Sequence, residues 1–155
     1  LVKFGGHAMA AGLTIHQDHF QQFQRCFDET IRQFISPDQL QGIIYTDGEL
    51  QAHEFNLQTV ELLRQAGPWG QNFAEPTFEG TFKVLQQRLL AGKHLKLMIE
   101  NQFGLLLDAI WFNVDLRRFP DLSIKQAKIV YKLDVNLFRG NQNLQLFVEH
   151  LQIEN

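Results

Sequence analysis

The sequence contains one cysteine, four prolines and no long apolar run. A single cysteine cannot form an internal disulfide, and Cys26 beside Phe27 on an expected helix is typical of a buried structural thiol. No run approaches the roughly 18 apolar residues of a membrane-spanning helix. Residues 1–15 also lack the basic start and apolar stretch of a signal peptide, so no membrane association and a cytoplasmic location are expected.

The charge of the chain is low overall but uneven. The net charge is −3, and residues before Phe78 contain four Lys and Arg against nine Asp and Glu. From Phe78 onward ten basic side chains face eight acidic ones. Any surface for nucleic acid is therefore expected mainly in the second half. The 155 residues are 45% hydrophobic and include 14 Phe, which is enough to fill the core of a globular domain.

The first half has helical periodicity. Apolar residues recur at steps of three and four from Phe20 to Phe34, which predicts an amphipathic helix from about Gln17 to Ile35. Residues 42–46 read as a short buried strand followed by an Asp-Gly turn. A second helix is expected to begin after the capping residue Asn56 and to stop at Gly67-Pro68, because proline cannot continue a helix.

The second half has the alternating pattern of β-strands. Strands are expected near residues 78–88, 93–101, 105–112, 127–138 and 143–153, with the longest connection between the third and fourth. Leu95, Leu97 and Ile99 share one face of the second strand, and His94 and Lys96 share the other. Five strands of this size predict a small closed barrel of the oligonucleotide-binding (OB) type.

The polar face of this barrel is a candidate site for single-stranded DNA. Such a site needs cations along the phosphates and flat groups on which bases stack. The cations could come from Lys93, His94, Lys96, Lys128, Lys132 and Arg139. The stacking groups could come from Phe82, Trp111, Phe112, Phe138 and Phe147, although most aromatic residues of a small barrel fill its interior. The sequence leaves open which of these aromatic rings stack.

The stretch "GGHAMAAGLTI", residues 5–15, is a second candidate site. Gly5 and Gly6 permit a backbone whose amide hydrogens point outward, and a helix beginning at His7 or the next residue would add positive potential. His7 could then donate a hydrogen bond to a phosphate oxygen, and Gly12 would allow a turn. A tight turn with a capping histidine remains the alternative.

Seven stretches in order carry a resemblance to a known family. They are "GGHAMAAGLTI", the amphipathic helix after it, "YTDGEL", "LLRQAGPWGQNFAEPTFEG", "GKHLKLMI", "LDAIWFN" and "YKLDVNLFRGNQNLQLFVEHL". Together they resemble the C-terminal part of bacterial RecJ, a family of 5′ to 3′ single-stranded-DNA-specific exonucleases. The first stretch is similar to the DHHA1 module of that family, and the rest resembles its OB domain.

The resemblance implies an α+β chain with three parts. A partial DHHA1 α/β segment is expected over residues 1–66, a linker over 67–77, and a five-stranded OB-type β-barrel for single-stranded DNA over 78–155. Gly5, Gly6 and His7 would face the phosphate at the DNA end. The chain has no Asp-His-His triplet, so no catalytic or metal-binding residue is expected here, and Mn²⁺ or Mg²⁺ would be held by a DHH domain outside it.

The partners implied are single-stranded DNA and, as a further candidate, a single-strand-binding protein. The resemblance places the enzyme in DNA repair and recombination, with this fragment inactive alone; its oligomeric state is left open. Two alternatives remain. One is a stand-alone OB module that binds nucleic acid or protein without a nuclease role. The other is a different DHHA1-bearing enzyme, which the barrel strands argue against.

Overall fold

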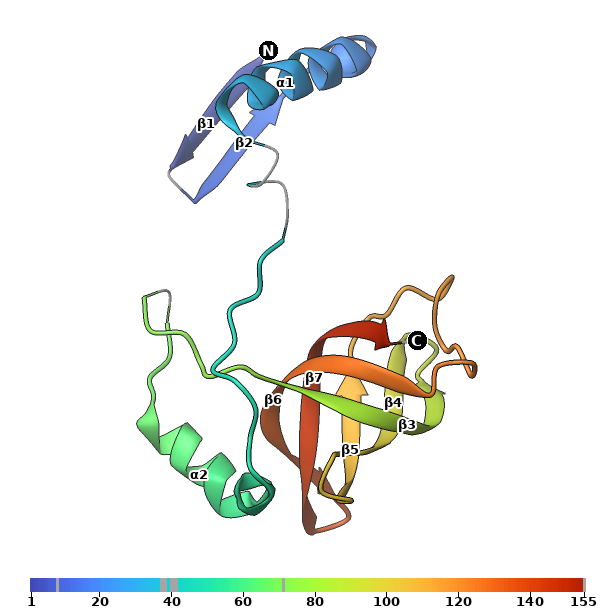
Figure 1. The fold of residues 1–155 in the computed structure, drawn as a ribbon. Coiled ribbons are helices and arrows are strands. Elements are labelled where there is room, and N and C mark those ends of the chain that lie inside the picture. Colours follow the sequence, from blue (N-terminus) through green and yellow to red (C-terminus); the bar gives the residue numbers. More distant parts are fainter. Residues whose placement is uncertain (8, 37–38, 40–41, 71, 155) are drawn as a thin grey trace. The chain divides into compact units, whose positions relative to one another are not determined.

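The computed structural model describes residues 1–155 except 8, 37–38, 40–41, 71 and 155. It divides into two compact units, Leu1–Ile44 and Tyr45–Asn155, which are described separately below (Figure 1).

The first unit is a β-hairpin followed by a helix. Strand β1 (Lys3–His7) pairs antiparallel with β2 (Ala10–Thr14), and the short 3₁₀ helix η1 (Gln17–His19) leads into α1 (Phe20–Phe34). The helix expected from Gln17 to Ile35 is confirmed. The buried thiol is not: Cys26 is exposed, because α1 buries none of its residues within this small unit.

The second unit begins with an irregular segment and a helix. The strand expected at residues 42–46 is wrong, since residues 42–50 form no strand. Isolated hydrogen bonds hold this segment instead, from Asp47 N–H to the Thr77 carbonyl (2.7 Å) and from Glu79 N–H to the Gly48 carbonyl (3.0 Å). After η3 (Ala52–Glu54), helix α2 spans Leu57–Ala66. Its predicted cap is confirmed, because the Asn56 side chain accepts a 2.8 Å hydrogen bond from Thr59 N–H.

Five strands then close into a barrel, which confirms the OB-type prediction. They are β3 (Phe78–Leu90), β4 (His94–Glu100), β5 (Leu106–Trp111), β6 (Gln126–Phe138) and β7 (Asn141–Glu154), in the order β3-β4-β5-β7-β6. All neighbours are antiparallel except β5 and β7, which pair in parallel over three residue pairs only. The β6–β7 hairpin is the longest feature of the barrel and curves around it (Figure 1).

The barrel core is filled by alternate strand residues and closed by the connecting segments. Leu95, Ile99 and Leu146 are fully buried between the strands. The long connection between β5 and β6 adds Val114, Phe119 and Ile124 to the same core. Strand alternation therefore works as expected, with the loop residues completing the packing.

The segment before the barrel belongs to the same core. Leu50 and Val60 are buried with the barrel residues, and Phe55 stacks on Tyr131 at a ring distance of 6.3 Å. Burial in these surroundings raises the pKa of the Tyr131 phenol well above its usual value. The compact unit consequently begins at Tyr45, whereas the sequence placed the second domain at 78 after a linker over 67–77.

A β-bulge interrupts β3 between Val84 and Gln86. Before the bulge, Phe78, Phe82 and Val84 point into the core. A bulge inserts one residue and so reverses which side chains face outward. Arg88 therefore lies on the outer surface, opposite Lys96 of β4.

Candidate nucleic-acid interface

The strand register aligns four outward residues across β3, β4, β5 and β7. Arg88 lies opposite Lys96, Lys96 opposite Ile110, and Ile110 opposite Phe147. We call Arg88, Lys96, Ile110 and Phe147 the outer row. Two cations at one side and apolar groups at the other are the combination that a single strand needs, with phosphates on one edge and bases on the other.

Three rings lie together beside this row. Phe112 and Phe147 stack at a centroid distance of 5.4 Å with 27° between their planes. The His94 ring meets Phe112 edge-on at 4.7 Å. We call His94, Phe112 and Phe147 the aromatic cluster. Phe112 is 43% exposed, so part of its ring is open to a ligand.

His94 is held in one orientation by the backbone. Its Nδ1 atom accepts a 3.1 Å hydrogen bond from Asn113 N–H. Nε2 is then the nitrogen that carries the hydrogen in the neutral ring. In this geometry His94 offers a hydrogen-bond donor and a flat ring to a bound strand.

The six residues predicted as DNA-binding cations do not form a single group. Lys93, His94 and Lys96 lie together at the start of β4, whereas Lys128 and Lys132 lie on β6. Arg139 is at the tip of the β6–β7 hairpin, where its guanidinium carbon lies 5.2 Å from the centroid of the Phe138 ring. Along a strand, Arg139 is about 23 Å from Lys132 at 3.3 Å per residue.

Three of these lysines are paired with carboxylates. Lys96 Nζ lies 2.8 Å from Asp108, and Lys128 Nζ lies 3.1 Å from Glu79. Lys132 Nζ contacts two acids. They are Glu149 at 2.9 Å and Glu75 at 3.2 Å, and the hydrogen bond to Glu149 raises the pKa of the Lys132 ammonium. Pairing of this kind reduces the charge that these lysines present to a phosphate.

Two exposed cations near the aromatic cluster have no carboxylate within ion-pair distance among the described residues. They are Arg88 and Lys93, the latter in the β3–β4 turn. Arg88 was not selected from the sequence, because simple alternation along β3 places it on the core side. Only the bulge brings it to the surface, and no sequence signal announces that bulge.

The remaining aromatic candidates are engaged elsewhere. Phe82 is buried and meets Tyr131 edge-on at 5.6 Å. Trp111 points to the core side and contacts Phe119 at 5.0 Å. Phe138 is exposed under Arg139 at the hairpin tip. The stacked pair on the outer surface is therefore Phe112 and Phe147.

Two hollows follow the outer surface and meet at two residues. One, of about 300 Å³, is lined by Gln86, Arg88, Lys96, Leu97, Met98 and Asp108. The other, of about 460 Å³, is lined by Phe55, Met98, Leu105, Leu106, Leu107, Asp108, Asn143 and Leu144. Because Met98 and Asp108 line both, the hollows are continuous across β4 and β5.

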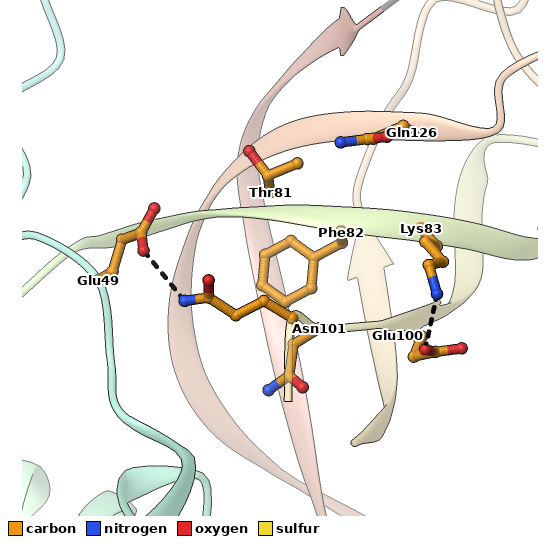
Figure 2. A pocket seen from close by; sticks show the side chains of 8 residues that line it. Glu49, Thr81, Phe82, Lys83, Glu100, Asn101 and Gln126 are labelled. Carbon is orange, nitrogen blue, oxygen red and sulfur yellow. Dashed lines mark hydrogen bonds and ion pairs between the residues drawn. The ribbon is translucent and has the colours of Figure 1, made fainter. Parts of the chain in front are cut away.

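A third hollow, of about 350 Å³, is less suited to a polyanion (Figure 2). Glu49 and Glu100 bring two carboxylates to it against one lysine. That lysine, Lys83, lies 3.0 Å from Glu100, and Gln102 donates a 3.3 Å hydrogen bond to Glu49. The polar groups that Figure 2 shows thus satisfy one another and present net negative charge to a phosphate.

The Gly-Gly-His stretch is a strand in the structure. Gly5, Gly6 and His7 lie in β1, and Gly12 lies within β2, so the expected helix start after Gly6 and the turn at Gly12 are wrong. Residue 8 lies outside the described residues. Gly6 has a steric reason, because a Cβ there would lie 2.7 Å from the Cβ of Ala11 across the hairpin. His7 is exposed, and its predicted role at a DNA end stays a prediction.

Within the described part of the chain, no three His, Cys, Asp or Glu side chains are grouped so that they could hold a metal ion. The described helices also include none that is long and apolar enough to cross a membrane.

A family model described as the RecJ OB domain matches residues 46–150. The chain belongs to the RecJ OB domain family. The match begins one residue after the start of the second unit, so the RecJ OB domain includes α2 as well as the barrel.

Full-length relatives have the same name. The chain is 53% identical over 155 residues to the single-stranded-DNA-specific exonuclease RecJ of Haemophilus influenzae, and 47% identical over 152 residues to that of Escherichia coli. These matches cover 98% and 97% of the chain but 27% and 26% of the relatives. The chain thus spans about a quarter of the length of the curated relatives it matches.

A solved structure shows the same fold. The crystal structure of RecJ in complex with Mg²⁺ from Thermus thermophilus matches with a TM-score of 0.69 at 19% identity. That match covers the whole chain and 23% of the Thermus chain.

Proposed function

We propose that the second unit binds single-stranded DNA on its outer row and aromatic cluster, as the strand-gripping part of a longer 5′ to 3′ single-stranded-DNA exonuclease acting in repair and recombination. The observation that carries this proposal is the Phe112–Phe147 stack, which lies beside two cations free of carboxylates, Arg88 and Lys93. The outer surface of the second and third strands is also where OB barrels bind oligonucleotides.

The salt dependence of binding tests the cationic part of this site. Neutralising Arg88 and Lys93 together (R88Q/K93Q) is expected to weaken oligo(dT) binding and to flatten the plot of log affinity against log salt by about 1.4, since each lost phosphate contact changes the slope by about 0.7. Fluorescence anisotropy across a salt series measures both. Arg32→Gln, an exposed arginine on α1, is the matched control. An unchanged slope would move the phosphate path elsewhere on the barrel.

The cleavage chemistry is proposed to lie outside this chain. The described residues do not fit a divalent metal site, because they bring no three ligands of the right type together. The Thermus relatives were crystallised with Mg²⁺ and with Mn²⁺, and such a metal is proposed for the part of the longer protein that the chain does not span. The role of this chain is then to hold the strand, in the bacterial cytoplasm.

The Gly-Gly-His strand is proposed to contact the DNA end in that longer protein. A chimaera in which this chain replaces the matching 155 residues of the Haemophilus influenzae relative allows a test. Changing His7 to Ala is expected to slow cleavage about fivefold, the effect of one lost hydrogen bond of about 1 kcal/mol, with little loss of binding to long strands. Equal loss of cleavage and binding would contradict a role at the end.

The alternative of a stand-alone OB module predicts the same DNA binding by the barrel. The chimaera separates the two, because a module with no nuclease role would not support cleavage there. A single-strand-binding protein is kept as a second proposed partner of the longer protein, and a binding assay with the purified protein would test it.

A further inference from the structure

Lys96 is the one cation of the outer row that the barrel neutralises itself. Its ammonium group lies 2.8 Å from the Asp108 carboxylate, and both side chains are only about one third exposed or less. Arg88, directly opposite Lys96 on β3, has no such partner among the described residues. Like charges opposite each other on neighbouring strands repel, so Asp108 relieves that repulsion in the free barrel.

The Asp108 carboxylate also lies where a bound strand would pass. It lines both hollows of the outer surface, at their junction with Met98. A strand that follows these hollows from Arg88 towards Phe147 crosses this carboxylate. A phosphate placed there competes with Asp108 for the Lys96 ammonium and is repelled by the acid itself.

Single and double strands differ in what this arrangement costs them. A duplex keeps its bases stacked inside and offers the barrel mainly phosphates, so it depends on the cations. A single strand offers base faces as well, and these gain stacking energy on the aromatic cluster. An acid that weakens the cations therefore penalises the duplex more than the single strand.

We propose that Asp108 is a specificity-determining residue that favours single strands over duplex DNA by withholding Lys96 from phosphates. The inference rests on the proposed binding of single-stranded DNA to the same surface. It gives Asp108 a role opposite to that of an ordinary DNA-binding residue, because its removal improves binding.

The test compares the 155-residue chain with its Asp108→Asn variant on oligo(dT) and on a blunt duplex of equal length. The variant is expected to bind the duplex about fivefold more tightly, the upper range for an exposed ion pair, and oligo(dT) about twofold more tightly. The preference for single strands falls accordingly. The salt slope should steepen by about 0.7 as one phosphate contact is gained.

Glu100→Gln is the matched control. It removes the same charge from the same strand and also frees a lysine, Lys83, but lies about 13 Å further along β4. It is expected to leave the preference between the two DNAs unchanged. An equal effect of Glu100→Gln would reduce the result to net charge and overturn the proposal.

Asp108→Ser serves as a second variant, so that the test does not depend on the folding of one protein. Unchanged or weaker duplex binding in whichever variant keeps its melting temperature overturns the role of Asp108. Failure of the proposed function has a different signature, because the parent chain would then bind oligo(dT) no better than a variant lacking the Phe112 and Phe147 rings.

Discussion

Replacing Phe112 and Phe147 together by leucine is expected to weaken binding of oligo(dT) by about 10- to 100-fold, since stacking contributes about 1–3 kcal/mol per base. Leucine keeps most of the buried apolar surface but has no flat face for a base. The loss should appear at high and low salt alike, because stacking involves no counterion release. Fluorescence anisotropy at two salt concentrations measures it.

The control for this experiment is Phe103→Leu. Phe103 is 42% exposed, against 43% for Phe112, but it lies in the β4–β5 turn away from the aromatic cluster. We expect it to leave binding unchanged. If F112L/F147L binds as tightly as the parent chain while keeping its melting temperature, the aromatic cluster is not the stacking site.

Changing Val60 to Asp is expected to destabilise the barrel by about 3 kcal/mol or more, because it places an unpaired carboxylate where only 1% of the valine is exposed. For a unit of this size the melting temperature should fall by about 10 °C or more. Circular dichroism of the strand signal measures the change. Leu62→Asp on the same helix, at a position that is 60% exposed, should have little effect.

This experiment also tests the extent of the domain. If α2 were part of a linker or of the preceding module, Val60→Asp would leave the melting of the strands unchanged. The burial of Leu50 and Val60 in the barrel core leads us to expect the opposite. A fragment beginning at residue 78 would then be less stable than one beginning at residue 45.

The strands and helices of this protein were largely predictable from its sequence. Alternation gave the five strands to within a few residues, because in a small barrel each strand has one buried and one exposed face. Asn56 and Gly67-Pro68 marked the limits of α2 because capping and proline chemistry act locally. Residues 42–46 were apolar enough for a strand but found only isolated hydrogen bonds instead of a pairing edge.

The site was predictable only in part, since it depends on long-range register. Phe112 and Phe147 are 35 positions apart in sequence, and their stacking follows from the parallel pairing of β5 with β7. Arg88 reaches the surface through a bulge that alternation does not reveal. The pairing of Lys96 with Asp108 likewise depends on how β4 and β5 align, so a count of charges overestimated the free cations.

The three-residue parallel contact between β5 and β7 has a mechanical consequence. It is the shortest ladder of the barrel, and the path from Lys96 to Phe147 runs straight across it. A strand bound along that path would bridge the weakest joint and tie its two sides together. Tension on the DNA would then load this seam first, so the grip of the barrel and its mechanical strength are set at the same place.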